Sequence, residues 1–124
     1  MDEEIYKENI LDHYKHPRNA GRIDDADFSG RELNPSCGDA TELFVKMDGG
    51  RVAEAKFAGR GCAVSQASVS MLTEKMKGMN LEELRGLNES DILGLLGIDV
   101  GPLRMKCAML PLRALAKALE VNKN

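Results

Sequence analysis

The pattern of hydrophobic and polar positions first predicts a short amphipathic helix. Residues 5–15 hold apolar side chains at four-residue steps among charged neighbours, namely Tyr6, Ile10 and Tyr14. Pro17 disfavours helical geometry in the residue before it, so this helix should end near Lys15. Residues 19–36 are rich in Gly, Asp, Asn and Arg and show no period, and we expect them to form connecting chain.

Alternation of apolar and charged residues over 43–47 and 53–57 predicts a β-hairpin. The apolar members are Leu43, Val45, Met47, Ala53, Ala55 and Phe57. The intervening residues 48–51 read Asp-Gly-Gly-Arg, which is typical of a tight turn between antiparallel strands. The run Gly59-Arg60-Gly61 is predicted to break the second strand.

Helices are predicted from Cys62 onward. An apolar stripe over residues 63–76 predicts a helix that Gly78 can terminate, which places Cys62 at the helix N-terminus. Asn80 and Glu83 have the spacing of a capping box, so a second short helix should run through Leu87. A third helix is predicted over residues 91–96, followed by a loop over residues 97–102.

The last helix carries an apolar stripe at steps of four, three and four residues, formed by Ala108, Leu112, Leu115 and Leu119. Because proline is tolerated in the first turn of a helix, Pro111 predicts that this helix begins shortly before it. Cys107 should therefore lie just before, or within, the helix start.

The order of these elements favours an α+β fold, with a small antiparallel sheet and helices packed on it. At 124 residues the chain has the size of one domain, and we expect a single unit over residues 1–124. Its 43% apolar and 30% charged residues are those of an ordinary globular protein.

Charge and cysteine content narrow the function classes. The net charge of −3 and the pI near 5.4 argue against nucleic-acid binding. The acidic start at residues 2–4 and the absence of an apolar run of ~20 residues argue against a presequence and a membrane span, so we expect a cytoplasmic protein. Three cysteines are an odd number, and a reducing compartment disfavours disulfides.

The three cysteines are hypothesised to bind an inorganic centre together with a carboxylate. Each falls at a predicted loop or helix start, and Asp39 follows Cys37 by two residues. Three thiolates suit an iron-sulfur cluster or zinc, whereas a carboxylate is a harder ligand that we expect to keep a cluster releasable. The spacings between cysteines match no short paired-cysteine signature, and a cysteine hydrolase or a purely structural metal remain alternatives.

The residues around each thiol resemble the U-type iron-sulfur cluster scaffold family over residues 5–120. The motifs that carry the resemblance are His16-Pro17-Arg18-Asn19-Ala20-Gly21, Asn34-Pro35-Ser36-Cys37-Gly38-Asp39, Phe57-Ala58-Gly59-Arg60-Gly61-Cys62-Ala63 and Arg104-Met105-Lys106-Cys107. The resemblance implies a SufE/NifU-like sandwich that receives sulfur from a cysteine desulfurase, combines it with iron and passes a [2Fe-2S] cluster to apo-proteins. It also implies that zinc can occupy the same site.

By motif position, the resemblance implies the ligands Cys37, Asp39, Cys62 and Cys107, with Cys107 as the sulfur acceptor of a scaffold that is not an enzyme. Where the housekeeping branch has a histidine, this chain has Lys106, and in this respect it resembles the Suf-type branch. The interval between the second and third cysteines is short, as in the housekeeping branch. A zinc-dependent sulfur (persulfide) carrier is the alternative function.

A further departure concerns a chaperone. Residues 100–104 read Val-Gly-Pro-Leu-Arg, where housekeeping scaffolds present Leu-Pro-Pro-Val-Lys to a dedicated Hsp70 chaperone. Only Pro102 remains of the two prolines, so this partnership is not expected.

Overall fold

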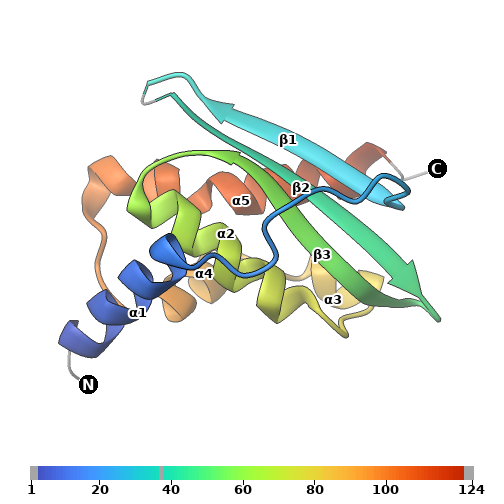
Figure 1. Ribbon diagram of the computed structural model, residues 1–124, viewed down its shortest axis with the longest axis horizontal. Coiled ribbons are helices and arrows are strands. Elements are labelled where there is room, and N and C mark those ends of the chain that lie inside the picture. The colour runs from blue at the N-terminus through green and yellow to red at the C-terminus, as the bar shows by residue number, and fades with distance from the viewer. Residues whose placement is uncertain (1–2, 37, 122–124) are drawn as a thin grey trace.

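A three-stranded antiparallel sheet lies over a layer of helices in the computed structural model, which describes residues 3–36 and 38–121 (Figure 1). The elements follow one another as α1 (Glu3–Lys15), β1 (Phe28–Asn34), β2 (Asp39–Asp48), β3 (Arg51–Arg60), α2 (Ala63–Met76), α3 (Leu81–Arg85), α4 (Glu89–Leu96) and α5 (Gly101–Val121). The predicted α+β class is confirmed. Within the described part of the chain, no helix is both long enough and apolar enough to span a bilayer.

The predicted hairpin is confirmed as β2 and β3, with one change in the residues that face inward. The register shifts between Lys46 and Met47, so Met47 pairs with Val52 and Ala53 is left as an extra residue. Val52 is therefore buried, whereas Ala53, which the alternation had placed inside, is exposed.

The strand β1 corrects the prediction that residues 19–36 are only connecting chain. It pairs antiparallel with β2 at the edge of the sheet and covers α5. Its inward positions include Gly30 and Glu32. A Cβ atom on Gly30 would lie 2.3 Å from the carbonyl oxygen of Ala114, and Glu32 accepts a hydrogen bond from Lys117 at 3.0 Å. Because Gly30 and the aliphatic part of Glu32 contact α5 at these positions, the sequence of β1 shows no alternation of apolar and polar residues.

The third strand also runs further than predicted. Gly59 and Arg60 remain paired with β2, so the glycine run does not break the strand. Gly59 has φ +138°, and a Cβ atom there would lie 2.1 Å from the carbonyl oxygen of Ala40. Glycine therefore allows two neighbouring backbones to approach closely where β3 ends.

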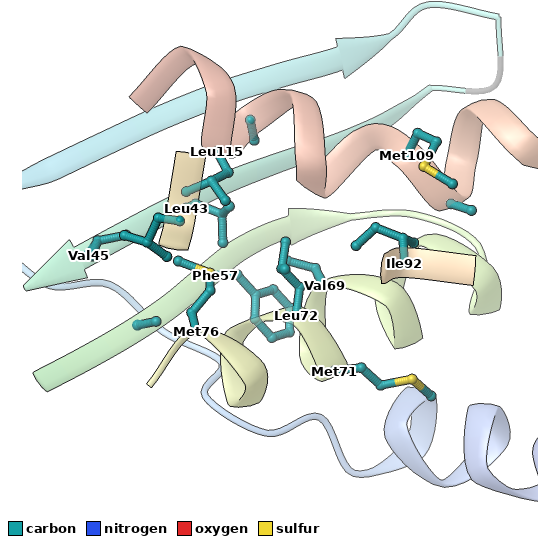
Figure 2. Close-up of a cluster of buried hydrophobic side chains, with 14 of the residues drawn as sticks. Leu43, Val45, Phe57, Val69, Met71, Leu72, Met76, Ile92, Met109 and Leu115 are labelled. Atoms are coloured by element: carbon teal, nitrogen blue, oxygen red, sulfur yellow. The ribbon is translucent and has the colours of Figure 1, made fainter. Parts of the chain in front are cut away.

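The hydrophobic core fills the space between the sheet and the helices (Figure 2). It is built from Leu43, Val45 and Phe57 of the sheet, Val69, Leu72 and Met76 of α2, Ile92 of α4, and Met109 and Leu115 of α5. Met71 is buried on the side of α2 that faces α1 (Figure 2). The methionines Met71, Met76 and Met109 thus have the packing role expected of them.

The helix α3 begins after its predicted cap, whereas α4 begins at Glu89, two residues before the predicted start. Asn80 and Asn88 each form a capping box, with Glu83 and Asp91 respectively. The α3 helix ends at Arg85, two residues before the predicted limit.

The last helix differs most from expectation. It begins at Gly101 and runs through Pro111, which lies in the helix interior rather than in the first turn. Pro111 is buried, and the helix continues for ten residues beyond it. Packing of α5 against the sheet and α2 stabilises this arrangement, although proline removes one helical hydrogen bond.

Candidate metal centre

Three connections meet at one end of the sheet (Figure 1). They are the turn between β1 and β2, the link from β3 to α2, and the first turns of α5. An open pocket of about 500 Å³ lies there, lined by Asp39, Gly61, Cys62, Leu103, Arg104 and Cys107. A carboxylate oxygen of Asp39 and the Sγ atoms of Cys62 and Cys107 all lie within 4.8 Å of one another. The fold therefore gathers three of the four predicted ligand residues.

Asp39 supplies a buried carboxylate at the start of β2. The residue is only 5% exposed, and its Oδ2 atom has no hydrogen-bond partner among the residues that the structure describes. A buried oxygen without a partner costs roughly 1–3 kcal/mol. A cation bound between this oxygen and the two thiols would remove that cost, so the donor set fits a metal.

Cys62 is the N-cap residue of α2, as predicted. Its carbonyl accepts hydrogen bonds from the Gln66 backbone N–H at 3.0 Å and from the Ser65 hydroxyl at 3.1 Å. Its side chain makes no capping hydrogen bond, and Sγ lies 3.9 Å from Ser65 Oγ. The partly exposed thiol thus lies beside the unpaired backbone amides at the start of a 14-residue helix.

Gly61 leaves the space that lets the Asp39 carboxylate and the Cys62 thiol lie close together. A Cβ atom at this position would lie 2.1 Å from Ser65 Oγ and 3.1 Å from Asp39 Cγ. Glycine therefore leaves room for the site, since a side chain here would separate Asp39 from the start of α2.

Cys107 lies in the second turn of α5, which corrects its expected place at the helix start. It is 5% exposed and also borders an adjoining hollow with Ser36 and Lys106. The Ser68 hydroxyl of α2 donates a hydrogen bond to the Ala108 carbonyl at 2.7 Å, which fixes the two helices beside each other. Packing of α5 thus positions this thiol, without help from a helix N-terminus.

Cys37 lies outside the described residues. The turn on either side of it borders the same region, because Asn34 and Ser36 line the hollow next to Cys107. The Gly38 backbone N–H donates to the Asn34 carbonyl at 2.9 Å, and Gly38 has φ +77°, which favours glycine. The chain therefore turns tightly beside the pocket.

Histidine plays no part in this pocket. His13 is buried against α2, where its Nδ1 atom lies 2.8 Å from the Ser70 hydroxyl. Burial lowers the pKa of His13, with Arg18 adding to the effect and Glu74 opposing it. His13 therefore has a structural role in the contact between α1 and α2. Lys106 is exposed at the rim of the adjoining hollow.

The fold and the pocket together define a class of protein, namely a small α+β protein with a candidate metal site of thiol and carboxylate groups at one end of a three-stranded sheet. The chain belongs to the family described as the NifU-like N terminal domain, whose family model matches residues 5–123. This finding confirms the resemblance to U-type scaffolds.

Two curated relatives and one solved structure illustrate the range of the family. The chain is 37% identical to the zinc-dependent sulfurtransferase SufU of Bacillus subtilis, over 93% of this chain and 89% of that protein. It is 36% identical to the iron-sulfur cluster assembly scaffold protein IscU of Escherichia coli K12, over 92% and 91%. The crystal structure of FiSufU from Fervidobacterium islandicum AW-1 has a TM-score of 0.76 at 31% identity, over 96% and 99%.

Proposed function

We propose that this chain is a scaffold that assembles a [2Fe-2S] cluster with sulfur from a cysteine desulfurase and transfers it to apo-proteins. The convergence of Asp39, Cys62 and Cys107 within 4.8 Å carries the proposal, together with the relatives that are named as scaffolds. Cys37 is the proposed fourth ligand. We further propose that residues 1–124 act as one unit in the cytoplasm, where thiols stay reduced.

The donor set explains how a cluster is held and then released. Thiolates are soft ligands that match iron in a sulfide cluster, and three of them provide tight binding. Asp39 contributes a harder oxygen ligand, which is a weaker match. Since the carboxylate is already buried beside the thiols, it binds without a large rearrangement, yet it is the first ligand that an acceptor thiol can displace.

Sulfur transfer requires a nucleophilic thiolate in the pocket, and Cys107 is the proposed acceptor. Its thiolate attacks the terminal sulfur of the desulfurase persulfide, forming a new S–S bond while the donor S–S bond breaks. The desulfurase cysteine leaves as a thiolate, so the transfer itself needs no oxidant or reductant; an external reductant is needed afterwards, when the transferred sulfur becomes the sulfide of a cluster. Because Cys107 is almost fully buried, the donor must reach into the pocket past the exposed Leu103.

Anaerobic reconstitution with iron and sulfide tests the scaffold function. We expect a visible chromophore with about two irons per chain, and slower release to an acceptor is expected for Asp39→Ala. Asp24→Ala, which removes an exposed carboxylate elsewhere, is the matched control and should transfer normally. Absence of absorption above about 350 nm would contradict assembly, and unchanged transfer by Asp39→Ala would remove the role of the carboxylate.

A zinc-dependent sulfur carrier is the second candidate function. It is favoured by the small separation of the three ligand atoms, since sulfur ligands of one zinc ion lie ~3.8 Å apart, and by the 37% identity to a zinc-dependent sulfurtransferase. It predicts one tightly bound zinc per chain and faster desulfurase turnover without a cluster. Metal and acid-labile sulfide analysis of anaerobically purified protein separates the two functions.

A further inference from the structure

The outer face of the sheet, opposite the helices, has a hollow of about 270 Å³ at the end that carries the metal centre. Three arginines line it, one from each of three separate segments: Arg22, Arg31 and Arg60. Arg31 of β1 and Arg60 of β3 flank β2, which contributes Glu42 to the hollow.

The positive charge in this hollow is only partly compensated. Arg22 forms an ion pair with Glu42 at 3.0 Å, and its guanidinium lies 4.7 Å from the centre of the Phe44 ring. Among the residues that the structure describes, neither Arg31 nor Arg60 has an ion-pair partner. Two arginines are therefore available to carboxylates from outside.

The hollow lies next to the metal pocket, and a smaller depression connects their linings. Arg60 also lines a smaller depression together with Asp39, and it is followed in the chain by Gly61 and Cys62. On the other side of the pocket, Arg104 and Lys106 lie on the rim. We define the basic face as Arg22, Arg31, Arg60, Arg104 and Lys106. The acidic residues within it are Asp39 and Glu42, although the whole chain has a net charge of −3.

We propose that the basic face docks an acidic surface of the protein that delivers sulfur, an inference that rests on the proposed function. A protein interface of standard size covers roughly 800 Å² per partner, equivalent to a disc of about 16 Å radius. A donor that covers an area of this size around the pocket can therefore also reach the arginine hollow, which adjoins the pocket through Arg60. Because persulfide and thiolate are both anionic, surrounding cations reduce the repulsion between them as they approach.

Arg31 is the residue that separates docking from metal binding. Arg104 and Lys106 stand at the pocket itself, so they also balance the charge of a centre with anionic ligands. Arg31 lines the hollow but is not among the residues that line the metal pocket. Its exposed side chain can be reversed in charge without disturbing the core.

The decisive measurement is the affinity of the purified chain for the cysteine desulfurase of the same organism, with the variants Arg31→Glu and Arg85→Glu. Arg85 is an exposed arginine of α3, near the opposite end of the sheet (Figure 1). At about 50 mM salt, we expect Arg31→Glu to raise Kd roughly fivefold to tenfold and Arg85→Glu to change it less than about twofold. At about 1 M salt, where charges are screened within ~3 Å, the difference should disappear.

Equal effects of the two variants, or a difference that persists at high salt, would overturn the docking role. Binding of a small anion is the other outcome to be excluded. If about 10 mM phosphate, at matched ionic strength, weakens the wild type to the level of Arg31→Glu, the hollow is a small-anion site instead. The Kd for the desulfurase is measured on protein without a cluster, whereas cluster reconstitution is measured without the desulfurase. Failure of the docking proposal can therefore be distinguished from failure of the scaffold proposal.

Discussion

Gly61→Ala is the substitution that most directly tests how the site is built. The added methyl group would lie 2.1 Å from Ser65 Oγ and 3.1 Å from Asp39 Cγ. The first distance is far below any contact that carbon and oxygen adopt, so either Ser65 or the β3–α2 link must move. Because Ser65 is 1% exposed and its hydroxyl donates to the Cys62 carbonyl, that movement disturbs the start of α2.

The magnitude follows from overpacking. Adding one carbon to a closely packed site costs ~1–3 kcal/mol, and 1.4 kcal/mol corresponds to about a tenfold change in the folding equilibrium. We expect the free energy of unfolding of the metal-free variant to fall by this amount, so that it unfolds at a lower urea concentration. Zinc affinity should fall further, because displacing Asp39 or Cys62 separates ligand atoms that lie within 4.8 Å in the native chain.

A double-mutant cycle shows whether the contact is the cause. Ser65→Ala removes the nearest atom, at a cost of ~0.5–1.5 kcal/mol for the lost hydrogen bond. In the double variant, Gly61→Ala should then cost less than it does alone, because the remaining contact is the one at 3.1 Å. Urea denaturation with and without zinc provides the four free energies. A Gly61→Ala variant with native stability and native zinc affinity, or strictly additive effects, would refute the steric argument.

Two further substitutions address the fold away from the site. Gly30→Ala should lower the free energy of unfolding, measured in urea, by at least ~3 kcal/mol. The reason is that its Cβ would lie 2.3–2.5 Å from backbone atoms of Ala114 and Ala118, and backbone atoms cannot rotate away as a side chain can. A loss below about 1 kcal/mol would contradict this packing. Burial lowers the pKa of His13 from its ordinary 6.5, so the unfolded chain binds the proton more readily and stability should fall as pH decreases below about 6.5. His13→Gln should flatten that dependence in urea titrations between pH 7 and 5, and an unchanged slope would assign it to other groups.

The elements that can be predicted from the sequence are those marked by a periodic pattern of apolar residues or by helix-capping residues. The β2–β3 hairpin, α2 and the Asn80 capping box belong to this group. β1 could not be found in this way, because its inward positions include Gly30 and Glu32, which contact a helix without being apolar. The start of α5 at Gly101 could not be predicted either, because a proline such as Pro111 normally lies in the first turn of a helix.

The site was predicted from motifs rather than from spacing. Cys62 could be placed at a helix N-terminus, but nothing in the intervals between cysteines shows that Asp39, Cys62 and Cys107 meet. Their convergence depends on the packing of α5 against the sheet and α2, which brings together residues far apart in the chain. The arginine hollow was missed for the same reason, since Arg22, Arg31 and Arg60 become neighbours only when β1 joins the sheet.

The contact between β1 and α5 also determines when the site can exist. Glu32 and Lys117, which join the two elements, are separated by 85 positions. During synthesis, the β1–β2 turn and Cys62 therefore leave the ribosome well before the helix that completes the pocket. Until α5 emerges and docks, Asp39 and Cys62 lack the third candidate ligand, Cys107, so the candidate site is complete only after this helix has packed against the sheet and α2.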